Sequence, residues 1–423
     1  MFKRHVINSS GIKRAKILIL VSGSIAAIRI PSLVSYLIKE NYEVKCVLTK
    51  NAENFIQPFS LSILSRNNCL LDEDQWNSKK SSPLHIELSN WADNIIMAPL
   101  TATTLSKWIT GNAEGLVASI LISNQKPTIV CPAMNTEMWN NYAVKRNYEK
   151  LKTYRNILPI EPSDGLLACD RLGTGKMAPN ELINLALDFV CTQNKDCNFN
   201  DLSNKSFLIT GGATFEKIDP ARNITNNSSG AMGLYLAQIA KFRGANVTYI
   251  HGPLKVHSDL KEGIKTIEIS TSEELVNLLR KEIDKYDYFF MNSAVTDIRL
   301  GNNNRQKIPK GELKNYFSEN IELVPDILQE MSTFKRNNQV FLGFCAFTGC
   351  MENLRLIIQK KFSIKGCDFI FANPIDIDGQ GFGSSSDNEG WLFDREGLEH
   401  HIVKTSKIDL ANKLINKIIS IDK

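Results

Sequence analysis

An apolar strand is followed by a polar loop in the stretch Thr128-Ile129-Val130-Cys131-Pro132-Ala133-Met134-Asn135-Thr136-Glu137-Met138. Its first four residues are apolar or β-branched, which is typical of a strand that is buried on both faces of a parallel sheet. The amide side chain of Asn135 follows soon after the strand ends. Because open α/β sheets place their ligands at the carboxyl ends of their strands, the stretch predicts an α/β fold with a site beside Asn135.

A cysteine thiol in a glycine-rich loop is the second candidate group for this site. Cys169 lies in the segment Ala168-Cys169-Asp170, and Gly173-Thr174-Gly175-Lys176-Met177 follows it closely. A cysteine is often a small buried residue, but the Gly and Asp neighbours of Cys169 favour a thiol exposed on a flap. An amide that can bind a carboxylate and a thiol that can swing over it suggest a small acidic substrate.

The rest of the chain repeats the α/β pattern in two halves, with β-rich runs alternating with helical periodicity. We predict two doubly wound, mostly parallel-sheet α/β domains at residues 1–190 and 204–423. A polar, Asn-rich stretch without periodicity, residues 191–203, is the expected linker between them. The expected strands are Lys16–Val21, Glu43–Leu48, Asn94–Ala98, Thr128–Cys131, Phe207–Thr210, Asn246–His251, Tyr288–Asn292, Val340–Phe344 and Asp368–Phe371.

Composition places the chain among ordinary globular proteins. Its 423 residues suffice for two to three domains, and its hydrophobic and charged contents are 43% and 22%. No apolar run reaches the ~20 residues of a membrane span. The basic start leads into a strand without the apolar core of a signal peptide, so we expect a cytoplasmic protein with no membrane contact.

Charge and cysteine usage exclude other classes. A net charge of +5 is modest and its basic residues are scattered, so solvated faces and anionic-ligand contacts explain them better than a nucleic-acid surface. Nine cysteines occur without a Cys-x-x-Cys pair, and Cys46, Cys131 and Cys345 lie in apolar strands. This pattern indicates reduced thiols, and neither a disulfide framework nor a zinc site.

Three loops with hydroxyl groups follow strands of the first half. They are Val21-Ser22-Gly23-Ser24-Ile25-Ala26-Ala27, Thr49-Lys50-Asn51-Ala52 and Ala98-Pro99-Leu100-Thr101-Ala102-Thr103-Thr104. Each could be merely a tight turn. Three such loops after parallel strands nevertheless favour one shared crevice, where hydroxyls, backbone amides and a helix N-terminus can bind a phosphate.

His85 precedes Ile86-Glu87-Leu88, in an expected loop. A single histidine is more often a structural residue than a catalyst. Its imidazole can nevertheless hold a carboxylate or move a proton at neutral pH. We therefore keep His85 as a candidate.

Taken together, these motifs resemble those of the flavin-containing cysteine decarboxylases, and most of all the phosphopantothenoylcysteine decarboxylases. The resemblance covers residues 16–190. It is carried by Ser22-Gly23-Ser24-Ile25-Ala26-Ala27, His85-Ile86-Glu87-Leu88, Pro132-Ala133-Met134-Asn135-x-x-Met138 and Ala168-Cys169. One departure is the loop Gly111-Asn112-Ala113-Glu114-Gly115-Leu116, where the family often carries Asn-Asp.

The resemblance implies an FMN-dependent decarboxylation of an N-acyl cysteine, with FMN first accepting and later returning a hydride. Cys169 would then donate a proton, His85 would assist the loss of CO2, and Asn135 would clamp the substrate carboxylate. A free thiol, mostly protonated at neutral pH, suits a proton donor. The residues implied for FMN binding are Gly23, Ser24, Ile25, Thr49, Pro99, Thr101, Thr104 and Met134.

The second half has a Gly loop of its own after a strand, Ile209-Thr210-Gly211-Gly212-Ala213-Thr214, and a polar segment from Asp219 to Gly230 that leads into a helix. The serines before this helix could simply cap it. Arg222 and Asn226 nevertheless supply a cation and an amide where an anion would dock. Further motifs are Ser293-Ala294-Val295-Thr296-Asp297, Lys307-Ile308-Pro309-Lys310, Val324-Pro325-Asp326-Ile327-Leu328 and Gly343-Phe344.

Over residues 204–423 this motif order resembles that of the phosphopantothenate–cysteine ligases, and the whole chain resembles the bifunctional proteins of bacterial coenzyme A biosynthesis. The resemblance implies that CTP with Mg²⁺ activates 4'-phosphopantothenate as an acyl cytidylate, from which cysteine displaces CMP. Arg222 and Asn226 would bind the acyl intermediate, and Lys307 would stabilise phosphoryl charge. The residues implied for CTP are Ser293, Asp297, Lys307, Pro325, Asp326, Ile327, Phe344, Lys361 and Lys365; the Mg²⁺ ligands stay unassigned. The spacing of Lys361 and Lys365 also suits a plain solvated helix face.

Departures from the ligase pattern are more numerous. The family's Gly-Pro-Thr-Arg-Glu is here Gly212-Ala213-Thr214-Phe215-Glu216, and Ala231 replaces the Lys of Ser-Ser-Gly-Lys-Met-Gly. Val324 replaces an Asn, and Phe347 replaces a Glu. Losing a Lys and an Arg near an anionic substrate weakens its binding, because charge-assisted hydrogen bonds are the strong ones.

Three hypotheses therefore stand. The first is a bifunctional enzyme acting on 4'-phosphopantothenate, cysteine, CTP and 4'-phosphopantothenoylcysteine. The second is a decarboxylase whose second half is structural or regulatory, and the third is a non-catalytic flavin-binding interaction protein. The combination of His85, Asn135 and Cys169 argues against the third. By the same resemblance we expect a homo-oligomer, with decarboxylase trimers assembled into dodecamers and ligase halves forming dimers.

Overall fold

The computed structural model describes residues 14–76, 82–193, 198–301, 306–377 and 387–421. The chain forms two compact units that meet between Asn200 and Asp201. Of the expected linker, residues 194–197 lie outside the described residues, as does the basic start up to residue 13. Phe199 at the end of that stretch is buried, stacks edge-on against Phe189 and donates its N–H to the Arg155 carbonyl.

The first unit is built on a six-stranded sheet in the order β3-β2-β1-β4-β5-β6, in which every neighbouring pair is parallel. This is the strand order of the doubly wound dinucleotide-binding fold, and it reverses direction between β1 and β4. The parallel α/β fold is therefore confirmed for this unit. The strands of the sheet are β1 (Lys16–Val21), β2 (Glu43–Leu48), β3 (Leu70–Leu71), β4 (Asn94–Leu100), β5 (Thr128–Pro132) and β6 (Ile157–Pro159).

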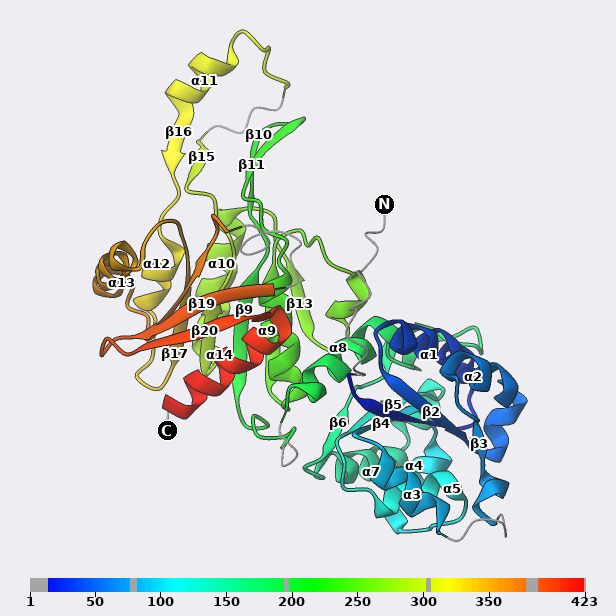
Figure 1. Cartoon of the computed structure of the whole chain (residues 1–423). Helices are drawn as coiled ribbons and strands as arrows, with labels where there is room; N and C mark the ends of the chain where they lie inside the picture. The colour runs from blue at the N-terminus through cyan, green and yellow to red at the C-terminus, as the bar shows by residue number, and fades with distance from the viewer. Residues whose placement is uncertain (1–13, 77–81, 194–197, 302–305, 378–386, 422–423) are drawn as a thin grey trace. The chain divides into compact units, whose positions relative to one another are not determined.

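Helices cover both faces of this sheet (Figure 1). A core of Leu, Ile, Val and Trp side chains joins one face to α3, α4, α5 and α7, while α1 and α8 lie on the other side of the sheet. Burial on both faces explains why all seven residues of β4 are buried. The remaining elements are η1 (Ile25–Arg29), α1 (Ile30–Lys39), η2 (Lys50–Asn54), α2 (Pro58–Ser65), η3 (Asp72–Trp76), α3 (Leu84–Trp91), α4 (Ala102–Thr110), α5 (Leu116–Ser123), α6 (Thr136–Asn140), α7 (Tyr142–Lys152), β7 (Ser163–Leu166), β8 (Leu172–Lys176) and α8 (Asn180–Cys191).

The second unit repeats the same winding in an eight-stranded sheet, in the order β13-β12-β9-β14-β17-β18-β19-β20. The first six strands are parallel, and β19 and β20 add an antiparallel hairpin at one edge. The predicted mostly parallel sheet is confirmed here too. The strands are β9 (Ser206–Gly211), β12 (Asn246–His251), β13 (Lys265–Glu268), β14 (Tyr288–Met291), β17 (Val340–Phe347), β18 (Phe369–Pro374), β19 (Asp387–Asp394) and β20 (Glu399–Ser406).

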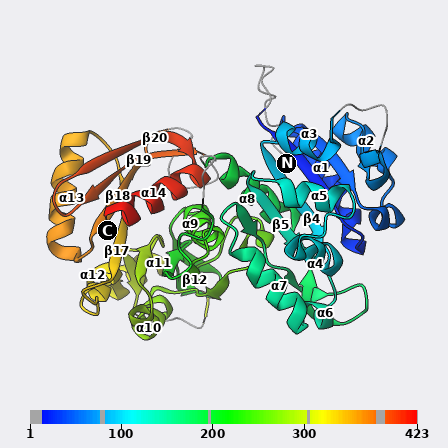
Figure 2. The same ribbon diagram turned by 90° about the horizontal axis from the view of Figure 1, so that it is seen from below.

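Helices α10, α12 and α13 pack on one face of this sheet, whereas α9 and α14 lie together on the other, as Figure 2 shows from below. Two short antiparallel pairs, β10 with β11 and β15 with β16, form an arm that extends from the sheet together with α11 (Figure 1). The remaining elements are β10 (Phe215–Asp219), β11 (Arg222–Thr225), α9 (Ala231–Phe242), η4 (Ser258–Lys261), α10 (Ser272–Glu282), η5 (Ile283–Lys285), β15 (Ile298–Leu300), α11 (Leu313–Asn320), β16 (Ile321–Leu323), α12 (Ile327–Ser332), α13 (Met351–Lys365) and α14 (Lys407–Ile421).

One local prediction is wrong. His85 was expected in a loop, but it is the second residue of α3, and its carbonyl accepts the Ser89 hydroxyl. Pro83 stands at the N-cap of α3, a position where its missing N–H costs nothing. The burial expected for Cys46, Cys131 and Cys345 is confirmed. None of the helices in the described part of the chain is both long and apolar enough to cross a membrane.

Candidate functional site

A buried serine joins two strand ends at the reversal point of the first sheet. Ser22 follows β1, and its hydroxyl donates to the Pro99 carbonyl at 2.6 Å while accepting the N–H of Thr101 at 3.0 Å. It thereby fixes the ends of β1 and β4 side by side. Such a reversal point is where open α/β sheets bind their ligands.

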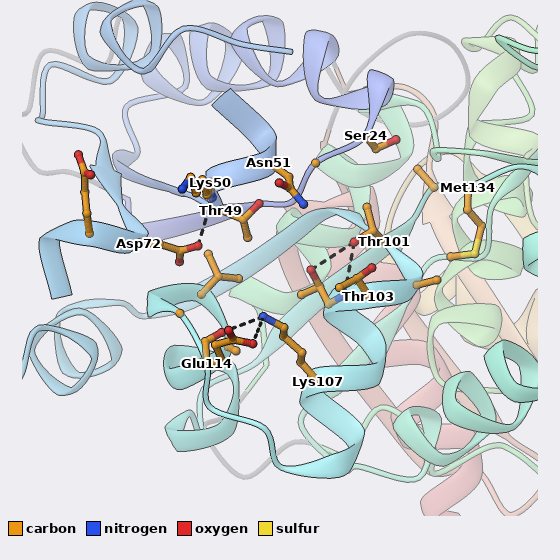
Figure 3. A pocket seen from close by; sticks show the side chains of 18 of the residues that line it. Ser24, Thr49, Lys50, Asn51, Asp72, Thr101, Thr103, Lys107, Glu114 and Met134 are labelled. Carbon is orange, nitrogen blue, oxygen red and sulfur yellow. Dashed lines mark hydrogen bonds and ion pairs between the residues drawn. The ribbon is translucent and has the colours of Figure 1, made fainter. Parts of the chain in front are cut away.

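A cleft of about 680 Å³ opens at this point, and we call it the threonine cleft. Hydroxyl groups from three strand exits face it, and Figure 3 shows Ser24, Thr49, Thr101 and Thr103 around it. Ser24 caps η1 through the N–H of Ala26. The residues lining the cleft are Gly23, Ser24, Thr49, Lys50, Asn51, Asp72, Glu73, Trp76, Thr101, Ala102, Thr103, Thr104, Lys107, Glu114, Gly115, Val117, Ala118, Ala133, Met134 and Met138.

Close approach of two loops requires a glycine here. A Cβ atom on Gly23 would lie 2.5 Å from the Cβ of Asn51, so any side chain at Gly23 would push the loops after β1 and β2 apart. Thr49 stands at the N-cap of η2, yet its side chain makes no capping hydrogen bond. Its hydroxyl is therefore not used by that helix and can face the cleft.

A second cleft, of about 540 Å³, contains the predicted amide and thiol, and we call it the Cys169 cleft. Asn135 and Cys169 both line it, and it shares Ser24, Ala133 and Met134 with the threonine cleft. The amide and the thiol that are predicted to share one site thus lie on the same cleft. The other lining residues are Ile25, Ala26, Ile28, Arg29, Leu166, Leu167, Ala168, Gly175, Lys176 and Met177.

Cys169 is exposed at the turn of the β7–β8 hairpin, which we call the flap (Ser163–Lys176). Asp170 next to it has a left-handed backbone (φ 58°), and the N–H of Asp170 donates to the Leu167 carbonyl at 3.0 Å. Asn135 begins α6, with its Oδ1 accepting the N–H of Met138 at 2.8 Å. Because Oδ1 is occupied, the Nδ2 amide hydrogens are the part of Asn135 left to meet an acid.

The structure separates the predicted cofactor residues into three groups. Gly23, Ser24, Thr49, Thr101, Thr104 and Met134 line the threonine cleft, and Ile25 lines the Cys169 cleft. Pro99 belongs to neither lining and acts through its carbonyl, which accepts from Ser22. His85, half-buried on α3, lies outside both sets of lining residues.

The second unit carries a cleft of about 230 Å³ at the carboxyl end of its own sheet, which we call the Asp326 cleft. It includes most of the residues predicted to bind a nucleotide. Lys307 and Lys361 are not among its described lining residues. Those that line it are Met291, Ser293, Val295, Thr296, Asp297, Val324, Pro325, Asp326, Ile327, Leu328, Phe344 and Lys365.

An ion pair orders one wall of this cleft. The Lys365 ammonium lies 2.8 Å from Asp326 Oδ2, and Asp326 Oδ1 caps α12 by accepting the N–H of Gln329. Burial alone would raise the pKa of Asp326, but the hydrogen bonds from Lys365 and Gln329, with charge from Lys361, hold it below its ordinary value. Lys361 therefore contributes its charge to the lowered pKa of Asp326 without lining the cleft.

Arg222 begins β11 of the β10–β11 hairpin, and Asn226 directly follows that strand. The Asn226 amide donates to the carbonyl of Val295, a lining residue, at 2.8 Å. Arg222 instead forms an ion pair with Asp219 and donates to the Ile308 carbonyl at 2.8 Å. Asp219 also accepts the N–H of Ile308, at 3.2 Å. The Asp219–Arg222 pair therefore binds both the N–H and the carbonyl of Ile308, which directly follows Lys307.

A cavity of about 40 Å³ adjoins the Asp326 cleft through Phe344. The start of α9, including Ala231, lines it together with Lys407, which is 4% exposed. Burial lowers the pKa of Lys407. Sequence reasoning missed Lys407, because a lysine in the polar run Lys404-Thr405-Ser406-Lys407 looks like a solvated surface residue.

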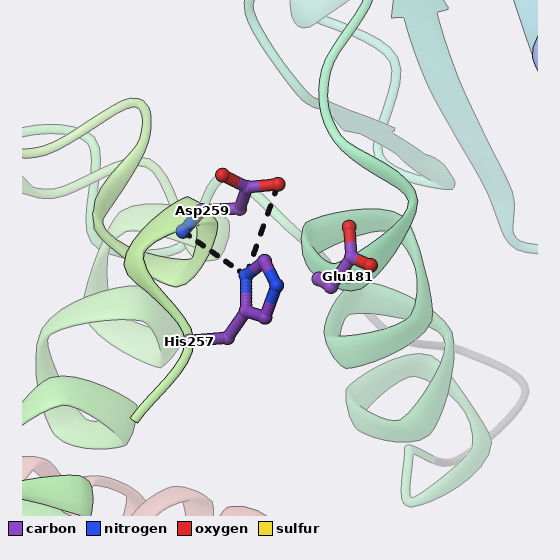
Figure 4. Close-up of side chains that lie close together, drawn as sticks. All are labelled: Glu181, His257 and Asp259. Carbon is purple, nitrogen blue, oxygen red and sulfur yellow. Dashed lines mark hydrogen bonds and ion pairs between the residues drawn. The ribbon is translucent and has the colours of Figure 1, made fainter. Parts of the chain in front are cut away.

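The histidine beside η4 has a structural explanation. His257 stands at the N-cap of η4, where its Nδ1 accepts the N–H of Asp259 and lies 3.8 Å from the Asp259 carboxylate (Figure 4). Its ring is thus used to begin a short helix.

Two family models match the chain, one in each unit. The flavoprotein family matches residues 5–192, and the DNA/pantothenate metabolism flavoprotein C-terminal domain matches residues 202–421. A solved PPC decarboxylase mutant complexed with pantothenoylaminoethenethiol is 36% identical over 42% of this chain and 97% of its own (TM-score 0.38). The C-terminal domain of a coenzyme A biosynthesis bifunctional protein CoaBC is 26% identical over 52% of this chain and 97% of its own (TM-score 0.42).

Full-length relatives match both units at once. The coenzyme A biosynthesis bifunctional protein CoaBC of Borreliella burgdorferi is 34% identical over 95% of this chain and 98% of its own. That of Escherichia coli K12 is 33% identical over 90% of this chain and 91% of its own. Because these full-length relatives cover at least 90% of this chain and a family model matches each unit, the chain belongs to the family of bifunctional coenzyme A biosynthesis proteins.

Proposed function

We propose that the chain makes 4'-phosphopantetheine from 4'-phosphopantothenate in two steps. Residues 204–423 would join 4'-phosphopantothenate to cysteine with CTP and Mg²⁺, and residues 1–190 would decarboxylate the product with FMN, residues 191–203 being the linker. The observation that carries the proposal is the position of Asn135 and Cys169 on one cleft that shares a wall with the threonine cleft.

The threonine cleft fits FMN. Its volume lies within the roughly 300–1,000 Å³ typical of cofactor pockets. Ser24, Thr49 and Thr101 offer hydroxyls for a phosphate, and Gly23 leaves the loop after β1 free of a side chain. FMN, when bound, supplies hydride transfer. The shared wall of Ser24, Ala133 and Met134 puts a substrate in the Cys169 cleft next to that cofactor.

The chain's own residues have distinct tasks in the decarboxylation. Asn135 keeps its Oδ1 in the α6 cap and uses its Nδ2 hydrogens to hold the substrate carboxylate. The exposed Cys169 thiol on the flap donates a proton to carbon after CO2 has left. The apolar Leu166, Leu167 and Met177 line the same cleft and would cover the reacting atoms once a substrate is bound.

His85 needs a different route to the substrate. Since it lies outside the lining of the Cys169 cleft, its assisting role calls for a second copy of the chain, in the homo-oligomer that we propose. Mixing a Cys169→Ser variant with a His85→Asn variant tests this. Restored decarboxylation in the mixture is expected, and no restoration after subunit exchange would rule out the shared site.

Decarboxylation itself is tested with purified full-length protein. We expect a yellow preparation with flavin absorbance that releases CO2 from 4'-phosphopantothenoylcysteine. Cys169→Ser should keep the flavin and lose product formation, whereas Cys350→Ser, an exposed thiol of the second unit, should leave it unchanged. A colourless protein that cannot be loaded with FMN would contradict the proposal.

The Asp326 cleft suits part of a nucleotide. At about 230 Å³ it lies below the usual pocket range, so the rest of CTP would extend beyond it. Asp326 is already paired with Lys365, which leaves Asp297 as the carboxylate suited to Mg²⁺ held jointly with phosphates. The start of α9 and the buried Lys407 at the start of α14, which both line the adjoining cavity, would attract an anionic group there.

In the ligation, the carboxylate of 4'-phosphopantothenate attacks the α-phosphorus of CTP and displaces pyrophosphate. The cysteine amine then attacks the acyl carbon and displaces CMP. Asn226, fixed by the Val295 carbonyl, would hold the acyl cytidylate, and Lys307 would offset phosphoryl charge. Arg222, on the β10–β11 hairpin that directly precedes Asn226, would also bind the acyl cytidylate.

The ligase half is tested by CMP release from CTP, cysteine and 4'-phosphopantothenate. We expect Lys307→Ala to abolish it and Lys310→Ala, three residues further on, to preserve it. If the wild type released no more CMP than Lys307→Ala, the second function would be favoured, which is an active decarboxylase with a regulatory second half. The departures from the ligase pattern at Ala231, Val324 and Phe347 motivate that alternative. We also infer a cytoplasmic location, where a reducing environment keeps Cys169 a free thiol.

A further inference from the structure

Asp72 is the point where two walls of the threonine cleft are tied together. Its Oδ2 accepts the backbone N–H of Lys50 at 3.1 Å, and its Oδ1 accepts the backbone N–H of Leu116 at 2.8 Å. Figure 3 shows Asp72 below Lys50, with a dashed line joining them. The two amides are far apart in sequence, one after β2 and the other at the start of α5.

Both bonded amides stand at the first residues of helices that flank the cleft. Lys50 begins η2 directly after Thr49, whose hydroxyl we assign to the phosphate, and Leu116 begins α5, whose Val117 and Ala118 line the cleft. A carboxylate at a helix N-terminus is favourable, because it meets unpaired N–H groups and the positive end of the helix dipole. Asp72 uses one oxygen for each wall.

The residue before Leu116 makes room for this arrangement. Gly115 has a backbone φ of +93°, and a Cβ atom there would lie 2.9 Å from Asp72 Oδ1. Glu114, which precedes Gly115, pairs with Lys107 of α4 at 2.9 Å. The departure Glu114-Gly115 from the family pattern therefore has a local explanation: one residue anchors the loop to α4, and the other lets Asp72 approach.

We propose that Asp72 is a positioning residue that sets the separation of the Thr49 and α5 walls and thereby tightens FMN binding. The inference rests on the proposed function, since it assumes that FMN occupies the threonine cleft. For removal of the Asp72 charge, this role predicts a change in FMN affinity opposite to the one that electrostatics alone predicts. Removing a negative charge beside a phosphate-binding cleft would by itself strengthen binding of an anionic cofactor, whereas loosening the walls weakens it.

The test is FMN titration of flavin-free full-length protein, with affinity and dissociation rate read from flavin fluorescence. Asp72→Asn keeps the size of the side chain but only one acceptor oxygen, so it should weaken FMN binding about 3- to 10-fold, as expected for one hydrogen bond. Asp72→Ala should weaken it further. Asp74→Asn is the matched control: it removes the same charge from η3, its remaining amide oxygen can still accept the N–H of Leu71, and it lies outside the cleft lining.

The outcomes separate the two claims. Wild-type protein that does not bind FMN would contradict the proposed function itself. Wild-type binding with equal or tighter binding by Asp72→Asn would overturn the positioning role alone. Weaker binding by Asp72→Asn with a faster dissociation rate, unchanged melting of the flavin-free protein and an unaffected Asp74→Asn supports it.

Discussion

The backbone N–H of Met134 donates a hydrogen bond of 3.0 Å to the carbonyl oxygen of Gly175, which joins the Asn135 loop to the flap that carries Cys169. Two glycines permit this contact. A Cβ on Gly175 would lie 2.1 Å from the Met134 carbonyl oxygen, and one on Gly173 would lie 2.3 Å from Thr136 Oγ1. The amide and the thiol thus keep their relation through backbone contact, and the thiol itself stays free for chemistry.

Gly175→Ala should therefore reduce decarboxylation by at least about 10-fold while FMN remains bound. The added methyl would collide with Met134 and push the flap from the Asn135 loop, and its φ of +155° adds strain of roughly 1–3 kcal/mol. Gly165→Ala is the control. Gly165 has a similar φ of +150°, but its nearest contact would be a flexible lysine carbon at 3.7 Å. Equal losses in both variants, measured as product per flavin, would show that backbone strain matters and the close approach does not.

Asn135→Asp should separate the structural and chemical tasks of that residue. Aspartate caps a helix as well as asparagine does, so α6 should stay intact. The change removes the amide donors and sets a negative charge against the substrate carboxylate, and like charges in contact cost several kcal/mol. We expect kcat/KM to fall by roughly 100-fold or more with unchanged melting.

The matched control for this change is Asn141→Asp. Asn141 caps α7 in the same way, with its Oδ1 accepting the N–H of Ala143 at 2.9 Å, and lies outside the lining of the Cys169 cleft. Steady-state decarboxylation by Asn141→Asp should match the wild type. If Asn135→Asp retained full activity as well, its carboxylate-binding role would be wrong.

Sequence pattern located the central strands well, because buried strands are rich in apolar and β-branched residues. The expected bounds Lys16–Val21, Glu43–Leu48 and Asn246–His251 are those of β1, β2 and β12. The arm strands β10, β11, β15 and β16 were not predicted. These strands are only three to five residues long, too short for an alternation of apolar and polar residues to stand out, and their pairing partners make them strands.

The same distinction holds at the sites. Residues that follow a strand or begin a helix, such as Asn135 and Asp326, could be predicted because topology brings strand exits together. Asp72 and Lys407 could not be predicted in this way. Asp72 is bonded to Leu116, and Lys407 lines a cavity with the start of α9, and both of these partners are remote in sequence. His85 was placed in a loop because a helix of eight residues gives too short a periodic signal.

Asp219→Ala should loosen the segment that carries Lys307. Asp219 accepts the Ile308 N–H and orients Arg222, which donates to the Ile308 carbonyl. Without it we expect faster tryptic cleavage after Lys307 and Lys310 and a lower rate of CMP release, with cleavage elsewhere unchanged. Asp201→Ala, which breaks the Asp201–Arg243 ion pair elsewhere in this unit, is the control. Unchanged cleavage at Lys307 in Asp219→Ala would contradict the anchoring role.

The ion pair between Asp326 and Lys365 should make the second unit's stability depend on acid pH. The pKa of Asp326 in the folded chain lies below its ordinary value, so its ionised form stabilises the fold above roughly pH 4. That contribution is lost as pH falls through the lowered folded pKa. Lys365→Met should therefore destabilise the unit by less than about 1 kcal/mol near pH 7, since Asp326 is only half-buried, and by progressively less below pH 4.

This difference can be followed by thermal unfolding of the full chain at constant ionic strength, using the transition that CTP shifts. Lys361→Met is the matched control, because it removes the same charge from α13 without breaking the 2.8 Å contact. Because the charge of Lys361 also lowers the pKa of Asp326, but less than Lys365 does, we expect its stability difference from the wild type to be smaller and to vary less between pH 3 and pH 7. A Lys365→Met difference that stayed constant down to pH 3 would show that packing of the lysine stem, and not the charge of Asp326, holds this wall of the cleft.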